Sequence, residues 1–357
     1  CSRKVFVSGD CRIDDENGGG TYIPLPCGFC LDRTSDDEYT FIEEMKRELA
    51  VVDELIGNIN LGHDKPNPYT TFTYPFDQEG KAEKVSAQLE ITMKLMPYVF
   101  AFNDKIQQCV IINELTGREV SFWRIGTETT GQPYDFSVKR VKHIIGRYAF
   151  PSPELRLEIQ TLESNNGDAR IVIPPLPFGF ADVSSIPRQF LFFPLIGTEN
   201  FGTNFIFHSK RLYPTERRNS FLLPKDNDGL IAKFRHNEKV LDEMIDVLFT
   251  YYDNNPFSQN LPIEFAEVSF RPEKQDDPVT RTYLQKLQDK FVNKFIHWKM
   301  IPTERGYLSM QDDCGFSVLH NDIYSTLSDD AIQQHMPALI SYNRRSEERR
   351  VGKECRS

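Results

Sequence analysis

The sequence predicts an α+β protein, because helical and strand patterns occupy separate stretches of the chain. Apolar residues at steps of three and four predict helices over residues 36–56 and 81–98. Short β-branched and aromatic runs between residues 106 and 195 predict a sheet, and two more helical stretches follow it. The 357 residues, 39% of them hydrophobic, suffice for two or three domains with sizeable cores.

The N-terminal elements come first. Strands are predicted at residues 4–8 and 21–25, and we expect them to form a hairpin around the Asn17-Gly-Gly-Gly20 turn. Helix 36–56 carries one apolar stripe, formed by Ile42, Met45, Leu49, Val52 and Ile56. A strand is predicted at 70–76, and the second helix, 81–98, has Pro97 near its end, where a helix can stop.

The later elements are mostly short strands. They are predicted at residues 108–113, 119–124, 138–147, 155–162, 169–173, 189–195 and 204–207. Thr116-Gly117 and Asn166-Gly167 fall where hairpin turns belong. Helices are predicted at 237–252 and 278–300, and Pro278 suits the first turn of the latter.

Composition narrows the class of protein. Lys and Arg number 42 against 52 Asp and Glu, so the net charge is -10 and general nucleic-acid binding is not expected. No apolar run approaches 18 residues, so no membrane-spanning segment is predicted. Seven cysteines in a long chain do not make a disulfide framework, which favours a reducing cytoplasm.

Familiar site motifs are incomplete. Cys27-Gly-Phe-Cys30 is half a zinc site without a second half, so we expect structural thiols. Gly197-Thr-Glu-Asn-Phe-Gly202 has the glycine spacing of a phosphate loop but lacks the following Lys-Ser. The seven histidines show no metal-ligand spacing. The chain is therefore predicted to hold no metal or cofactor by itself.

The densest charged segment, residues 208–219, follows a predicted strand. Cations in a loop after a strand can contact an anionic group such as a phosphate. The alternative is a solvated loop paired with Glu199 and Glu216. The cations in question are Lys210, Arg211, Arg217 and Arg218.

The two ends suggest an internal fragment. The chain opens at Cys1 without an initiator Met, and Val5–Val7 already reads as a strand. Residues 344–357 lack apolar periodicity and resemble translated adapter sequence found at the ends of metagenomic contigs. We expect that tail to be non-native, although a solvated basic tail is the alternative.

Several segments resemble the region after the ATPase domain in sacsin and its bacterial relatives. They are Phe190-Leu-Phe-Phe-Pro-Leu-Ile-Gly197, Asn204-Phe-Ile-Phe-His208 and Thr215-Glu-Arg-Arg-Asn-Ser220. Upstream, Thr70-Thr-Phe-Thr-Tyr-Pro-Phe76 and Leu95-Met-Pro-Tyr-Val-Phe-Ala-Phe102 are similar to the last strand of that domain and the helix leaving it. The resemblance covers roughly residues 1–310, through loose motifs.

The resemblance implies a Bergerat-type ATPase of the gyrase, ninety-kilodalton heat-shock chaperone, histidine kinase and MutL group. Residues 1–98 would be the C-terminal part of its α/β sandwich, 99–260 a mixed α/β transducer (middle) domain, and 261–343 a helical and mixed segment. The complete protein would bind ATP and Mg²⁺ through N-terminal motifs that this sequence lacks. Arg217 and Arg218 match the family's paired-Arg loop and become candidate γ-phosphate contacts; Lys210 and Arg211 match no family position clearly.

Three functions remain open at this point. The first is a chaperone-like, ATP-driven conformational machine with an unknown protein client. The second is a DNA-processing or defence ATPase of the MutL or topoisomerase type, and the third is a non-catalytic interaction module. In each case the fragment alone is expected not to hydrolyse ATP.

Overall fold

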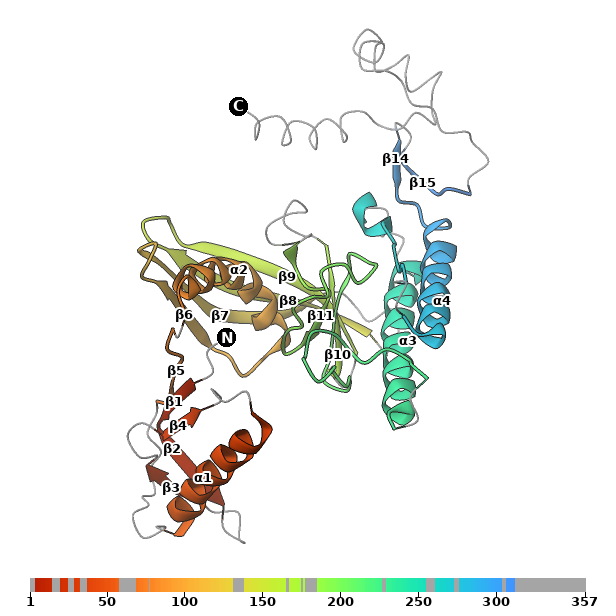
Figure 1. The fold of residues 1–357 in the computed structure, drawn as a ribbon. Helices are drawn as coiled ribbons and strands as arrows, with labels where there is room; N and C mark the ends of the chain where they lie inside the picture. The colour runs from red at the N-terminus through yellow and green to blue at the C-terminus, as the bar shows by residue number, and fades with distance from the viewer. Residues whose placement is uncertain are drawn as a thin grey trace. The chain divides into compact units, whose positions relative to one another are not determined.

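The α+β class is confirmed by the computed structural model, in which helices and mainly antiparallel sheets alternate along the chain (Figure 1). The chain divides into two compact units, residues 1–88 and 89–357. The structure describes residues 4–14, 20–24, 29–32, 37–57, 69–76, 78–130, 138–164, 167–174, 176, 185–226, 229–254, 261–272, 276–303 and 306–311. Cys27 and the 344–357 tail lie outside these residues.

The first unit contains a three-stranded sheet, a separate two-stranded one and a helix. Its elements are β1 (Lys4–Ser8), β2 (Asp10–Asp14), β3 (Gly20–Pro24), β4 (Phe29–Asp32), α1 (Glu38–Gly57), β5 (Thr71–Thr73) and the start of α2 (Lys81–Phe102). Strand β1 lies between β4 and β5 and is antiparallel to both. The apolar stripe of α1 is exposed where it is described, with Ile42 at 42%, Met45 at 38% and Leu49 at 58%.

The predicted N-terminal hairpin has a different partner strand. Strand β3 pairs with β2, from Asp10 opposite Pro24 to Asp14 opposite Gly20, and not with residues 4–8. Only five residues separate β2 from β3 in the sequence, whereas pairing of β3 with β1 would close a longer stretch of chain at greater entropic cost. Gly9, at φ 148°, lies between β1 and β2, a conformation that glycine adopts without strain.

The second unit is built on an eight-stranded sheet in the order β12-β11-β13-β10-β9-β8-β7-β6. Every neighbouring pair is antiparallel except β11 and β13, which are parallel. The strands are β6 (Gln108–Asn113), β7 (Arg118–Thr130), β8 (Val138–Ala149), β9 (Leu155–Ser164), β10 (Ala169–Ile173), β11 (Gln189–Leu191), β12 (Phe193–Pro194) and β13 (Ile206–Ser209).

Helices cover both faces of this sheet over different strands. The buried end of α2 packs on one face through Tyr98, Phe100 and Phe102, against apolar side chains of β6 to β9 such as Phe122 and Ile145. On the other face, α3 (Ile231–Asn254) packs against β9 and β10, and α4 (Pro278–Phe295) lies beside α3 (Figure 1). A 3-10 turn (Ile263–Ala266) and a small hairpin, β14 (Ile301–Thr303) with β15 (Gly306–Leu308), complete the described part.

Most predicted elements of this unit are confirmed. Strands β6 and β10 have the predicted bounds, while β7 extends six residues beyond its predicted end, to Thr130. Gly117 and Gly167 have φ of 64° and 67°, as their predicted turns require. Asp277 caps α4 by accepting a hydrogen bond from the Val279 N–H at 2.8 Å, and Pro278 occupies the first turn.

Pro97 does not end α2, which continues to Phe102. Every residue from Leu95 to Phe102 is buried, so packing on the sheet offsets the hydrogen bond that proline cannot donate. Two arginines from the sheet then hold the helix end. Arg124 donates to the carbonyls of Phe100 (2.5 Å) and Asn103 (3.0 Å), and Arg170 donates to that of Ala101 (2.6 Å).

A buried polar row crosses the same sheet face beneath α2. Arg170 of β10 lies opposite Glu163 of β9 and His208 of β13. Its guanidinium donates to both carboxylate oxygens of Asp104, at 3.1 and 2.6 Å, and its Nε lies 3.4 Å from Glu163 Oε1. His143 Nε2 is 3.0 Å from the same Glu163 oxygen. Burial opposes ionisation of Glu163, but His143 and Arg170 outweigh it and lower the pKa of this carboxyl.

His208 is the neutral member of the row. Its ring stacks on Phe102 at 5.0 Å between centroids, and its Nδ1 lies 3.3 Å from the Phe192 nitrogen and 3.2 Å from the Phe190 oxygen. Burial lowers the pKa of His208 to about 4, and the charge of Arg170 adds to the effect. The folded protein therefore keeps this imidazole uncharged at pH values where an unfolded chain would protonate it.

We predict that His208 makes stability fall as the solution is acidified. Between pH 6.5 and 4 the unfolded chain binds a proton at this site and the folded chain does not, so the free energy of unfolding rises with pH. This difference in pKa between the unfolded and the folded state corresponds to a change of about 3 kcal/mol in the free energy of unfolding. Urea unfolding of wild type and His208→Gln across this range measures it. The free energy of unfolding of the variant should change less with pH than that of wild type. Equal pH dependence of the two proteins would show that His208 does not titrate as described.

Candidate functional site

The paired arginines lie at the tip of a small closed loop after β13, here called the arginine loop (residues 213–222). Its two limbs are joined by a bridge between Pro214 and Phe221 and by a hydrogen bond from the Leu222 N–H to the Tyr213 carbonyl at 2.9 Å. Across the tip, the Thr215 N–H donates to the Ser220 carbonyl at 2.8 Å. The loop is thus a defined structure with its own backbone hydrogen bonds.

The tip is a tight turn held by its own polar side chains. The Arg218 N–H donates to the Thr215 carbonyl at 2.9 Å. The Thr215 hydroxyl donates to Asn219 Oδ1 at 2.7 Å, and the Asn219 N–H donates back to that hydroxyl oxygen at 3.2 Å. Arg218 has φ 53°, a left-handed conformation that costs energy for a residue with a Cβ. Such strain often accompanies functional positions.

Two buried amides fix the base of the loop. Asn237 of α3, 3% exposed, accepts from the Tyr213 N–H at 2.8 Å and donates to the carbonyls of Tyr213 (2.8 Å) and Leu222 (2.9 Å). Gln189 of β11, fully buried, accepts from the Phe221 N–H at 2.9 Å. Both limbs of the loop are therefore hydrogen-bonded to buried side chains of the core, at positions that water does not reach.

The structure separates the four candidate cations into two kinds. Lys210 lies 2.5 Å from Asp168, and Arg211 lies 2.7 Å from Glu243, so each is an ion pair. Arg217 and Arg218 are exposed, and within the described residues neither has an acidic partner within 4 Å. The expected alternative, a loop neutralised by Glu199 and Glu216, is not formed there. These two guanidinium groups are available to an external anion.

Sequence reasoning did not assign two further side chains close to the loop, Lys233 and His236. Lys233 of α3 lies over the Tyr213 ring, 5.6 Å from its centroid. His236 contacts the same ring edge-on at 5.2 Å, and its Nε2 lies 2.9 Å from the Arg211 carbonyl oxygen. The residues that anchor the loop, Gln189 and Asn237, were also missed. Each is an isolated amide with no local motif, so no sequence signal marks it.

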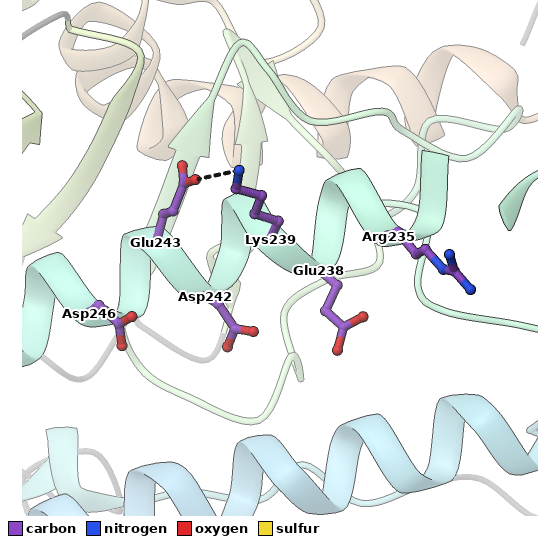
Figure 2. A pocket seen from close by; sticks show the side chains of 6 residues that line it. All are labelled: Arg235, Glu238, Lys239, Asp242, Glu243 and Asp246. Atoms are coloured by element: carbon purple, nitrogen blue, oxygen red, sulfur yellow. Dashed lines mark ion pairs between the residues drawn. The ribbon is translucent and has the colours of Figure 1, made fainter. Parts of the chain in front are cut away.

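An open hollow on α3 is a less suitable site (Figure 2). Glu238, Asp242 and Asp246 point from α3 toward α4, where lysines meet them. Lys286 lies 3.4 Å from Glu238, and Lys290 lies 3.1 Å from Asp242 and 2.8 Å from Asp246. The remaining lining residues are Arg235, Lys239 and Glu243. The hollow is therefore part of an ion-paired contact between two helices.

In the described part of the chain, no group of three or more His, Cys, Asp or Glu is placed to hold a metal ion. No helix found there is long and apolar enough to cross a membrane. Comparisons of the chain with protein-family models, with curated proteins and with solved structures gave no match. Among the arrangements described above, the arginine loop is therefore the best candidate site, because its two guanidinium groups can bind an anion.

We predict that Asn237→Asp destabilises the protein although its size is unchanged. The new carboxylate cannot donate to the Tyr213 and Leu222 carbonyls, and it would be buried beside them. The free energy of unfolding should fall by about 2–4 kcal/mol in urea titrations. Asn254→Asp is the matched control on the same helix, because Asn254 is exposed. It should cost less than about 1 kcal/mol, and equal losses would refute the anchoring role of Asn237.

Proposed function

We propose that this chain is part of an ATP-driven, chaperone-like protein in which the arginine loop contacts the γ-phosphate of ATP. The observation that carries the proposal is the loop itself: Arg217 and Arg218 project from a strained, doubly anchored tip without acidic partners in the described residues. Guanidinium groups suit a phosphate because they donate several hydrogen bonds in a plane and stay charged.

The chemistry follows from where charge develops. During phosphoryl transfer, negative charge spreads over the oxygens of the transferred group, and a positioned arginine stabilises it more than it stabilises the ground state. In this proposal Mg²⁺ and the nucleotide are bound by parts of the parent protein outside this sequence. The residues of this chain hold the backbone of the two arginines in place, so that domain closure brings their guanidinium groups to the phosphate.

The first unit supports the proposal in a second way. Helix α1 leaves Ile42, Met45 and Leu49 exposed in the described structure. An apolar stripe along a 20-residue helix is normally covered by another element. If residues 1–98 are the back of an ATPase sandwich, the remainder of that sandwich would provide the cover. In this proposal the second unit is the middle domain. It transmits the conformational change driven by ATP hydrolysis to a protein client.

The test is Arg218→Ala in the complete parent protein. Turnover of ATP should fall roughly 10²–10³-fold, as for removal of one charge-stabilising donor, while the dissociation constant for ATP stays nearly unchanged. Lys210→Ala is the matched control, since Lys210 is an exposed cation close in sequence but paired with Asp168. Turnover by Arg218→Ala equal to wild type would defeat the assignment of the loop.

Loop geometry can be separated from charge with two further variants. Arg218→Lys keeps the charge, and Arg218→Gly removes it but relieves the left-handed strain. Arg218→Gly should lose turnover while its free energy of unfolding stays within about 1 kcal/mol of wild type. A salt-dependent gel shift by the parent protein on DNA, unaffected by these variants, would instead favour a DNA-processing ATPase.

A further inference from the structure

Strand β6 forms an open edge of the eight-stranded sheet. Its sequence, Gln-Cys-Val-Ile-Ile-Asn, contains no charged residue and no proline. Val110 and Ile112 are 46% and 59% exposed, on the sheet face that α2 does not cover. Proteins usually protect such an edge with charge, proline, a bulge or a short strand, because unpaired backbone groups recruit another strand.

The opposite edge of the same sheet has that protection. Strand β12 is only two residues long and ends in Pro194. The irregularity in the β6 half of the sheet, between Arg124 and Gly126, lies on β7 and leaves β6 regular. The two edges therefore differ, and only β6 offers a straight six-residue template.

The hydrogen-bond pattern shows which groups face outward. The Arg124 N–H donates to the Gln107 carbonyl at 2.9 Å, just before β6 begins. Antiparallel pairs alternate between bonded and non-bonded, so residues 107, 109, 111 and 113 bond β7. The backbone N–H and C=O groups of Gln108, Val110 and Ile112 consequently point away from β7, along the open edge.

Charges at the ends of β6 favour a second copy of the same chain as the occupant. Exposed Lys105 precedes the strand and exposed Glu114 follows it, and in the described residues neither forms an ion pair. Two antiparallel copies would bring each Lys105 next to the Glu114 of the other. A parallel arrangement would instead put like charges together. The strand is thus complementary to itself in one orientation.

We propose that two copies of this chain associate through antiparallel pairing of their β6 strands, joining two eight-stranded sheets into one. A two-fold axis at Val110 sets that residue opposite its own copy and Gln108 opposite Ile112 of the second copy. The outward N–H and C=O groups of both strands then pair. Tyr148, 41% exposed, lies in the same cross-strand row as Val110, two strands from the axis and beyond Ser121. This inference does not depend on the proposed function.

Sedimentation equilibrium of the full chain over a wide concentration range tests the proposal. Wild type should reach twice the chain mass of 41.4 kDa. Val110→Lys should raise the dissociation constant of the dimer by roughly tenfold or more, since it opposes two charges on the axis. Val279→Lys is the matched control: it makes the same change at a 44% exposed valine of α4 and should leave the dimer intact. A wild type that stays monomeric, or equal effects of both variants, would overturn the proposal.

Charge exchange tests the orientation. Lys105→Glu and Glu114→Lys should each weaken association several-fold, and the double variant should restore it, because both cross-copy pairs are rebuilt in reverse. Failure of the double variant to recover would rule out this antiparallel register. Circular dichroism and thermal melts confirm folding of each variant. A monomer that instead binds an unrelated extended peptide at β6 would assign the edge to a different partner.

Val110→Pro examines the backbone directly. Because the Val110 N–H faces outward, proline there should leave the melting temperature close to wild type and abolish the dimer. Ile111→Pro removes a bond to β7 and should lower the melting temperature. The reverse ranking would mean that the outward set of residues is misassigned and would sink the proposed pairing.

Discussion

The guanidinium of Arg170 is the contact on which the second unit depends most. It joins the end of α2, through Ala101 and Asp104, to the middle of the sheet at Glu163. An unpaired cation here would cost several kcal/mol, but Arg170 meets acceptors on three sides. The hydrogen bond from Arg170 lowers the pKa of Asp104, and the pKa of Glu163 is also low despite burial. Charge compensation thus fixes both the helix and the strand register.

The same strand register leads to the arginine loop. Arg170 lies opposite His208, and β13 ends one residue later, where the chain turns toward the loop. Strand β11 runs parallel to β13 and supplies Gln189, while α3 on the other face supplies Asn237. The loop is therefore anchored from two elements whose positions the sheet determines. A tip held in this way loses little conformational freedom on binding an anion, which favours affinity.

The sequence predicted local features better than distant ones. Helix periodicity identified α1, α2, α3 and α4, and turn residues identified Gly117 and Gly167, because these signals act over a few residues. The prediction that β3 pairs with residues 4–8 was wrong, because strand pairing depends on loop closure as well as on strand propensity. The paired arginines were visible as a charge cluster, but their anchors were not. Asn237 and Gln189 contact residues 24 and 32 positions away.

The isolation of Arg217 and Arg218 is informative because the chain is rich in acid. With 52 carboxylates against 42 Lys and Arg, cations are in short supply, and an exposed arginine has many possible partners. Two other arginines close to the loop are satisfied: Arg188 donates to Thr203 and Asn204, and Arg211 pairs with Glu243. The turn at Thr215, with Arg218 in a left-handed conformation, instead holds the backbone of these two arginines where the described residues place no carboxylate within ion-pair distance of their side chains. Composition alone would have favoured neutralisation, so the fold of the loop is what keeps the pair available.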